Sequence, residues 1–155
     1  MDTRSLTNLT TLHPKFRPSA LQAWAEAQAA MPANVQILVV QGLRSFAESD
    51  ALFAQGRTKP GPIVTKAAAG QSYHNYGLAF DFAMITDGRD DDTVGPNWLK
   101  VVSIMESHAM FWGGHFGDGF HDDPHFENRF GFNWRQLLVL HDAGNFLPGT
   151  TYVNI

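Results

Sequence analysis

Cysteine is absent from this 155-residue sequence, which excludes disulfide bonds and any metal site with thiolate ligands. Long apolar runs are missing as well, and no stretch approaches the roughly 20 residues that a helix needs to cross a bilayer. We therefore expect no membrane insertion. Positive charge is also scarce, since the net charge is −4, so the composition gives no electrostatic reason to expect binding to nucleic acid.

Residues 1–6 lack the basic start and apolar segment of a secretory signal peptide, so we expect a protein made in the cytosol. The chain is long enough for one domain with a hydrophobic core, and its apolar fraction of 44% is ordinary for a folded protein. Neither an internal repeat nor a low-complexity linker divides it. The expected organisation is a single domain over residues 1–155.

Hydrophobic periodicity and capping signals predict helices mixed with short strands. The helices are expected around residues 21–28, from the capping box of Ser45 and Glu48 to near Gly56, from Pro96 to Ala109, and over 134–141. The strands are expected at residues 35–40, 78–84, 111–112 and 124–127, with a polar turn at 87–92. Because the two kinds of element do not alternate strictly, this order favours an α+β fold over a doubly wound sheet.

Residues 72–81 combine potential metal ligands with a flexible glycine and a strand-like apolar run. His74 offers an imidazole, Asp81 offers a carboxylate, and Gly77 permits a backbone turn that aims both at one point. A separation of seven residues places His74 on the turn before the strand, because odd separations point to opposite faces of a continuous strand. His125 is the candidate for a third ligand. Two histidines and one carboxylate suit a catalytic zinc ion, which acidifies a bound water and makes it a nucleophile.

Hydrolysis also needs a general base near the attacking water and a donor for the carbonyl oxygen. Asp122 and Asp123 are the candidates for the base. Simple alternation favours Asp123, which would share a face with His125, but Pro124 disturbs that pattern and leaves the choice open. Arg44 could donate to the oxyanion or bind a substrate carboxylate with its planar fork.

The remaining polar clusters have simpler interpretations. His108, His115, His121 and His141 lack such partners in the sequence, and we interpret them as structural, with His115 and His121 as candidates for the cleft wall. The acidic run at residues 87–92 is interpreted as a solvated turn and not as a cation site.

Several ordered motifs, spread over residues 12–134, resemble one known family. They are Ser72-x-His74-x-x-Gly77-x-Ala79-x-Asp81, Trp112-Gly113-Gly114 and Asp122-x-Pro124-His125-Phe126, with Gly42-Leu43-Arg44-Ser45 and Ala54-Gln55-Gly56-Arg57-Thr58 upstream. The chain resembles the zinc peptidases of the D-alanyl-D-alanine carboxypeptidase superfamily. Within it, the similarity is greatest to the L-alanyl-D-glutamate endopeptidases that serve as phage endolysins.

The resemblance implies a fold with a small central antiparallel sheet flanked by helices. It implies that His74, Asp81 and His125 bind Zn²⁺ and that Asp122, three residues before the last histidine, is the catalytic carboxylate in preference to Asp123. Arg44 would steady the substrate and the oxyanion, and Ser72 would contact the substrate. The implied substrate is the stem peptide of peptidoglycan, cut between L-alanine and D-glutamate by a zinc-bound water.

Because the tail after Gly144 is too short for a separate wall-binding domain, we expect a monomeric protein with a single catalytic domain. It would wait in the cytoplasm of the bacterial host until a phage-encoded pore releases it to the wall. Two alternatives stay open. One is a D-alanyl-D-alanine carboxypeptidase or dipeptidase on the same scaffold, and the other is a wall-binding module that has lost catalysis.

Overall fold

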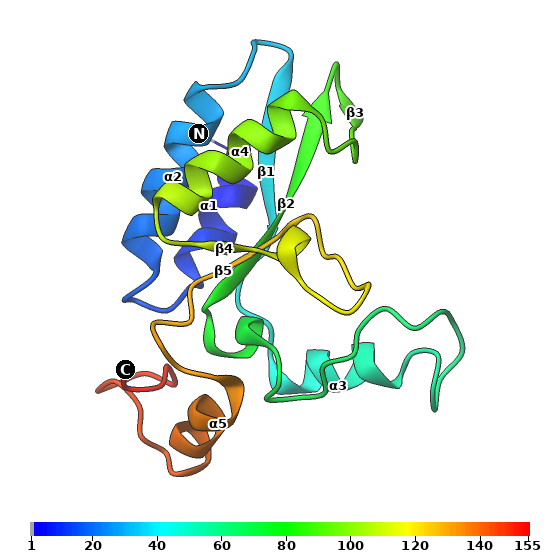
Figure 1. Cartoon of the computed structure of the whole chain (residues 1–155). Coiled ribbons are helices and arrows are strands. Elements are labelled where there is room, and N and C mark those ends of the chain that lie inside the picture. Colours follow the sequence, from blue (N-terminus) through cyan, green and yellow to red (C-terminus); the bar gives the residue numbers. More distant parts are fainter. Residues whose placement is uncertain (1) are drawn as a thin grey trace.

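A computed structural model describes residues 2–155 (Figure 1). The helices are α1 (Thr3–Thr10), α2 (Arg17–Ala29), α3 (Phe46–Ala54), α4 (Pro96–Ser107) and α5 (Trp134–Asp142), with 3₁₀ turns η1 (Tyr73–Tyr76) and η2 (Gly113–His115). The strands are β1 (Val35–Gln41), β2 (Ala79–Thr86), β3 (Arg89–Asp90), β4 (Phe111–Trp112) and β5 (His125–Glu127). The α+β class predicted from the sequence is confirmed. Over residues 2–155, no helix has the length and apolarity to cross a membrane.

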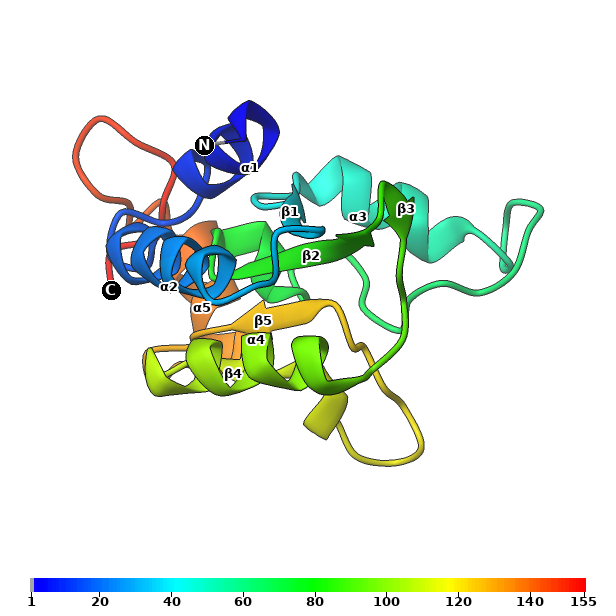
Figure 2. The same cartoon turned by 90° about the horizontal axis from the view of Figure 1, so that it is seen from above.

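The strands form one antiparallel sheet in the order β1-β2-β5-β4, and β3 pairs with the end of β2. Figure 1 shows α1, α2 and α4 together beside the long strands, whereas α3 and the loop after it project on the other side. Seen from above in Figure 2, β2 and β5 run between α3 on one side and α4 on the other. The small antiparallel sheet flanked by helices agrees with the sequence-based expectation.

The free edge of β1 is covered by side chains from α1 and α2. Ser5 accepts a hydrogen bond from the Val39 N–H at 2.8 Å, and Asn8 donates to the Val39 carbonyl at 2.8 Å. Trp24 of α2 donates to the Ile37 carbonyl at 3.1 Å. These bonds protect an edge that would otherwise expose unpaired backbone groups. The sequence analysis did not predict α1, because polar side chains occupy part of the face that α1 turns to the sheet.

Strand β2 separates the core from the opposite face of the sheet. Phe80, Phe82 and Met84 alternate along it and are buried in the core, while Asp81 between them points to the other side. The core continues across β5 through Phe126 and onto α4, where Trp98 lies 4.5 Å from Phe82 between ring centroids. This alternation leaves the opposite face of β2 and β5 available for polar chemistry.

Two local features differ from the sequence prediction. The expected polar turn at 87–92 contains β3, because Asp87 and Gly88 both have positive φ (52° and 76°) and close a two-residue hairpin. Such turns match the twist of paired strands and favour the Asp-Gly sequence. Ala109, expected in the helix that begins at Pro96, lies beyond the end of α4 with φ 61°.

Candidate active site

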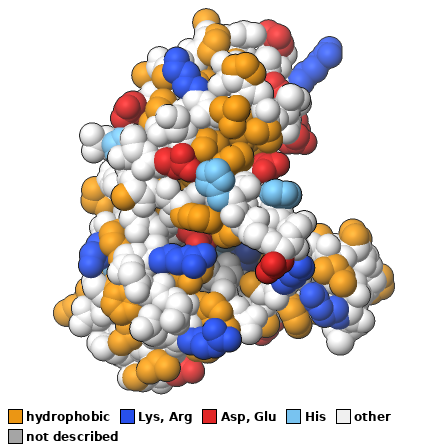
Figure 3. Space-filling model, in the orientation of Figure 1, with side chains coloured by type: hydrophobic (Ala, Val, Ile, Leu, Met, Phe, Trp, Pro, Cys, Tyr) orange, Lys and Arg blue, Asp and Glu red, His pale blue; other side chains and the backbone are white. Residues whose placement is uncertain are grey.

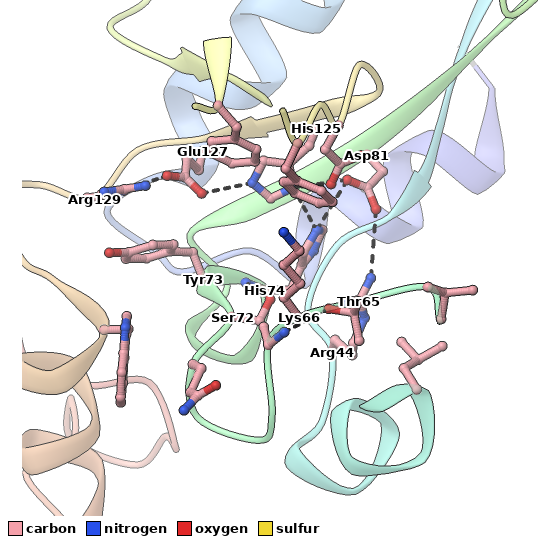
Figure 4. A pocket seen from close by; sticks show the side chains of 18 residues that line it. Arg44, Thr65, Lys66, Ser72, Tyr73, His74, Asp81, His125, Glu127 and Arg129 are labelled. Carbon is pink, nitrogen blue, oxygen red and sulfur yellow. Dashed lines mark hydrogen bonds and ion pairs between the residues drawn. The ribbon is translucent and has the colours of Figure 1, made fainter. Parts of the chain in front are cut away.

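A cavity of about 530 Å³ opens on the polar face of the sheet, at the junction of β2, β5, η1 and the loop before α3. Its walls contain all the residues that the sequence analysis proposed for catalysis, substrate binding and metal binding: Arg44, Ser72, His74, Asp81, Asp122 and His125. Figure 4 shows the side chains of Arg44, His74, Asp81 and His125 converging from different elements. The space-filling view in Figure 3 shows the hollow between the main body and the projecting α3 region, with Lys and Arg side chains around it.

The pairing of two strands brings Asp81 and His125 together. They are direct partners in the antiparallel register of β2 and β5, and both side chains point away from the core. Asp81 Oδ1 lies 3.2 Å from His125 Nδ1. The juxtaposition of these two groups therefore follows from backbone pairing alone.

His74 reaches the same point from η1, the 3₁₀ turn that precedes β2. The Ser72 hydroxyl caps this turn by accepting from the His74 N–H at 3.3 Å, and Gly77 ends it with φ 68°. A side chain at Gly77 would also collide with the backbone of His13, since its Cβ would lie 2.6 Å from the His13 nitrogen. Glycine is thus required here both for conformation and for space. His74 lies on the turn before the strand, as its spacing from Asp81 predicted.

The three candidate ligand atoms form a nearly regular triangle. His74 Nε2, His125 Nδ1 and Asp81 Oδ1 lie 3.2 Å from one another along each edge. Donors that bind a tetrahedral zinc ion at about 2.0–2.1 Å are separated by roughly 3.3 Å. Two imidazoles and a carboxylate in this arrangement fit zinc and leave a fourth position open.

The other ring nitrogens of the two histidines are bonded to the protein. His74 Nδ1 lies 2.9 Å from the Gly42 carbonyl, and His125 Nε2 lies 2.8 Å from a carboxylate oxygen of Glu127. Both partners are acceptors, so each ring carries its proton on that side and turns a lone pair into the triangle. Such outer contacts fix the tautomer and orientation of metal-binding histidines.

Sequence reasoning missed Glu127. It is almost fully buried, and its second oxygen is ion-paired with Arg129 Nε. Its spacing from His125 could have revealed it, because residues two apart on a strand share a face and Glu127 follows His125 by two. Sequence reasoning likewise missed Arg129 and Tyr73, which line the same cavity.

Electrostatics in the triangle favour a cation. Burial opposes the charged form of Asp81, but His74 and His125 outweigh it and hold the pKa of Asp81 well below its usual range. Burial also lowers the pKa of His125, yet its hydrogen bonds to Asp81 and Glu127 raise the pKa to about 9. A metal ion and a proton would compete for His125 Nδ1, which makes metal affinity dependent on pH.

The two candidate bases are placed differently. Asp122 lines the cavity, with one carboxylate oxygen 3.8 Å from His125 Nδ1. Asp123 does not line it, and its carbonyl accepts from Trp112 Nε1 at 2.7 Å. Burial and the nearby charge of Asp81 raise the pKa of Asp122. Gly113 is needed beside it, because a Cβ there would lie 2.3 Å from the Asp122 carbonyl oxygen.

Arg44 approaches the triangle from the loop after β1. Its guanidinium lies 3.7 Å from Asp81, and its Nε is buried without a hydrogen-bond partner among residues 2–155. Two hydrogen bonds hold the Arg44 backbone against η1. The Arg44 N–H donates to the His74 carbonyl (3.0 Å), and the Asn75 side chain donates to the Arg44 carbonyl (3.0 Å). Arg44 is therefore held in place with part of its donor capacity unused.

The remaining histidines of the sequence analysis lie outside this cavity. Each has another partner: His108 pairs with Glu26, His115 with Glu106, His121 with the Gly114 carbonyl, and His141 stacks on Phe46. The acidic run at 87–92 is engaged in local hydrogen bonds, such as that of Asp91 with Thr86.

Comparisons with known proteins agree with this geometry. Residues 65–128 match a protein family described as D-alanyl-D-alanine carboxypeptidase. Over 129 residues the chain is 42% identical to the peptidoglycan L-alanyl-D-glutamate endopeptidase CwlK of Bacillus subtilis (strain 168), covering 75% of this chain and 72% of that protein. The chain belongs to the D-alanyl-D-alanine carboxypeptidase family.

Two solved structures share this fold. The L-Ala D-Glu endopeptidase ChiX of Serratia marcescens matches with a TM-score of 0.61 and 21% identity, over 84% of this chain and 90% of that one. The vancomycin resistance D,D-dipeptidase VanXYg matches with a TM-score of 0.56 and 18% identity, over 88% of this chain and 61% of that one. By its family and its 42% identity to CwlK the protein is a metallopeptidase. Zinc is its cofactor, as the sequence predicted, and the group of His74, Asp81 and His125 fits that ion.

Proposed function

We propose that this protein is an L-alanyl-D-glutamate endopeptidase that cleaves the stem peptide of peptidoglycan. The observation that carries the proposal is the triangle of His74, Asp81 and His125, with the Asp122 carboxylate beside it in one open cavity. The 42% identity to an endopeptidase of that specificity supports the choice of bond.

In the proposed reaction, His74, Asp81 and His125 hold the zinc ion. When bound, this ion supplies Lewis acidity, which polarises a carbonyl and lowers the pKa of a water molecule from about 15.7 to about 7. Asp122 takes the proton of the attacking water and later returns it to the leaving amine. The raised pKa of Asp122 suits both proton transfers, because a carboxyl with a higher pKa holds the proton more readily after the first transfer and before the second.

Arg44 and Ser72 are proposed to act on the substrate. The partly unpaired guanidinium of Arg44 would stabilise the negative charge that develops on the carbonyl oxygen, where fixed donors are most effective. Ser72 lines the cavity next to His74, and its hydroxyl would contact the peptide. Both roles depend on placement by η1, which also carries the metal-binding His74.

The biological setting is proposed on the sequence resemblance to phage endolysins. In this setting a monomeric, single catalytic domain stays in the cytoplasm of the host and reaches the wall when a phage-encoded pore opens. Expression in a bacterial host with and without such a pore tests it. Lysis only with the pore supports the endolysin role, and lysis without it contradicts this route of release.

Mass spectrometry of fragments from purified murein tests the activity. The proposal predicts glycan strands that keep L-alanine and released peptides that begin with D-glutamate, with both products lost when a chelator is added. Release of terminal D-alanine alone would instead identify a carboxypeptidase or dipeptidase. Binding to murein without any cleavage would identify an inactive wall-binding module.

A further inference from the structure

Arg129, just after β5, is held by a carboxylate and by two aromatic rings, of which the more distant is Phe111, with its ring centroid 5.8 Å from the guanidinium carbon. Its Nε is ion-paired with the buried carboxylate of Glu127. The guanidinium carbon lies 4.5 Å from the centroid of the Tyr73 ring, so the charged plane rests near an aromatic face. One edge and one face of the guanidinium are thereby fixed.

The other edge of this guanidinium is free. The two terminal nitrogens of Arg129 make no hydrogen bond to any residue within 2–155, and the side chain, which is 46% exposed, lines the cavity. A planar pair of donors held in one orientation matches the geometry of a carboxylate. Prior fixation reduces the entropy lost on binding, which favours a specific ligand over bulk solvent.

Arg129 and Arg44 lie on opposite sides of the proposed metal site. Arg44 approaches Asp81, whereas Arg129 is connected through Glu127 to the far ring nitrogen of His125. Figure 4 shows Arg129 and Tyr73 at one end of the cavity, with Arg44 and Thr65 at the other. Apolar side chains of Leu52 and Val64 also contribute to the cavity wall. The arginine with the free edge thus lies at the end away from Arg44.

We propose that Arg129 is a carboxylate-binding subsite that receives the D-glutamate side of the stem peptide and sets the direction in which the peptide lies across the metal. This inference rests on the proposed function. In a stem peptide linked onward through the γ-carboxyl of D-glutamate, every free carboxylate lies on the leaving-amine side of the scissile bond. The L-alanine side carries none. Of the two arginines in the cavity wall, Arg44 is assigned to the oxyanion, so Arg129 is the one that marks the leaving-group end.

The free carboxylate comes from D-glutamate itself or from the residue after it, and substrate variants distinguish the two. The substrate is an N-acetylated peptide, L-Ala-γ-D-Glu-L-Lys, prepared with both carboxylates free, with the α-carboxyl of D-glutamate amidated, or with the C-terminal carboxyl amidated. The enzymes are the zinc-loaded wild type, Arg129→Gln and Arg135→Gln. Arg135 is a matched control, because it also stacks on an aromatic ring (4.4 Å from Trp134) but does not line the cavity.

For the wild type, amidation of one carboxylate is expected to lower kcat/KM by about tenfold, mainly through KM, which is the scale of a lost charge-assisted hydrogen bond. Arg129→Gln should lower kcat/KM for the free peptide similarly and remove the difference between free and amidated forms. Arg135→Gln should keep the full difference. The amidated position that matters identifies the carboxylate.

A second measurement separates substrate binding from support of the metal site, since Arg129 touches Glu127. Zinc affinity of Arg129→Gln, measured by competition with a chromogenic chelator, should stay within about threefold of the wild type, because Glu127 keeps its bond to His125. The subsite would be overturned if Arg129→Gln lowered kcat/KM equally for all three peptides and so still preferred the free peptide over the amidated ones. If the wild type cleaves no L-Ala–D-Glu bond in any peptide, the proposed function fails first and this inference with it.

Discussion

Each histidine of the triangle has one ring nitrogen directed at the metal position and the other committed to the protein. For His74 the outer partner is the Gly42 carbonyl, and for His125 it is the Glu127 carboxylate. Both partners fix the tautomer and the orientation of their rings, and the charged carboxylate of Glu127 also raises the pKa of His125. The two ligands therefore differ in chemistry although both are imidazoles.

Replacing Asp122 tests the proposed proton transfer. Asp122→Asn keeps the size of the side chain and removes its basicity, so we expect kcat on a stem peptide to fall by about a hundred- to ten-thousand-fold. Bound zinc, measured by elemental analysis, should stay at the wild-type level, because Asp122 is not in the triangle. Asp123→Asn is the control and should keep activity, since Asp123 lies outside the cavity wall. Loss of activity in Asp123→Asn with retention in Asp122→Asn would reverse the assignment.

Replacing Glu127 tests the orientation of His125. Glu127→Gln retains the shape but loses the charge, and zinc affinity is expected to fall by about 10- to 100-fold in chelator competition. Glu106→Gln is the matched control, because Glu106 also pairs with a histidine, His115, at 3.0 Å but on the surface. Equal zinc affinity in the Glu127 variant and the wild type would mean that Glu127 does not support the site.

The sequence could predict His74, Asp81 and His125 as a set, because imidazole and carboxylate at a turn and on strands are sufficient to suggest a metal site. Periodicity could not choose between Asp122 and Asp123, since Pro124 interrupts the strand before His125. The choice came from the family resemblance. Glu127 could have been found from its spacing to His125, but a lone glutamate on a strand is not distinctive without its buried partner.

At the scale of elements, the turn that carries His74 is attached to the N-terminal segment and the C-terminal tail. The His13 N–H donates to the Gly77 carbonyl at 2.9 Å. The His13 ring accepts from the Lys15 N–H at 3.0 Å and lies 2.8 Å from the Val153 carbonyl, which requires a proton on that second nitrogen. The ring is buried and fits only as the neutral form.

This arrangement predicts a pH dependence of stability. Burial lowers the pKa of His13, so the folded state binds fewer protons there than the unfolded state. Its contribution to stability is complete above the unfolded pKa of about 6.5 and is lost as the pH falls through the lower folded value. Between about pH 7.5 and about pH 5.5, the free energy of unfolding, measured by urea denaturation, should therefore fall more in the wild type than in His13→Gln. Parallel losses in the two proteins would contradict this role of His13.

Elements with a regular hydrophobic pattern could be predicted from the sequence, including β1, β2 and the helix that begins with the capping box at Ser45. Helix α1 could not, because Ser5 and Asn8 on its sheet side bond to β1 where apolar residues are expected. Strand β3 is only two residues long, and the acidic run at residues 87–92 around it concealed the Asp-Gly hairpin turn. Tertiary hydrogen bonds therefore decide α1, which local composition does not indicate, whereas β3 follows from a local turn whose sequence was present but was not interpreted as a hairpin.

At the scale of the whole molecule, the sheet separates stability from chemistry. One face of β2 and β5 builds the aromatic core around Phe80, Phe82 and Phe126, and the other places Asp81 and His125 in the cavity. The other proposed site residues, Arg44, Ser72, His74 and Asp122, come from turns and loops. Backbone hydrogen bonds tie Arg44 to η1 and Asp122 to β5. The reacting groups are thus supported by a rigid scaffold while the cavity remains open to a peptide.

Zinc titration of the metal-free protein, followed by cleavage of a synthetic L-Ala-γ-D-Glu peptide, tests the central claim most directly. The account predicts no cleavage without metal, then a linear rise in rate that ends at about one zinc ion per chain, the capacity of a single three-ligand site. The products should be the two halves of the L-Ala–D-Glu bond. Cleavage at full rate by the metal-free protein, or a zinc-loaded protein that leaves this bond intact, would contradict it.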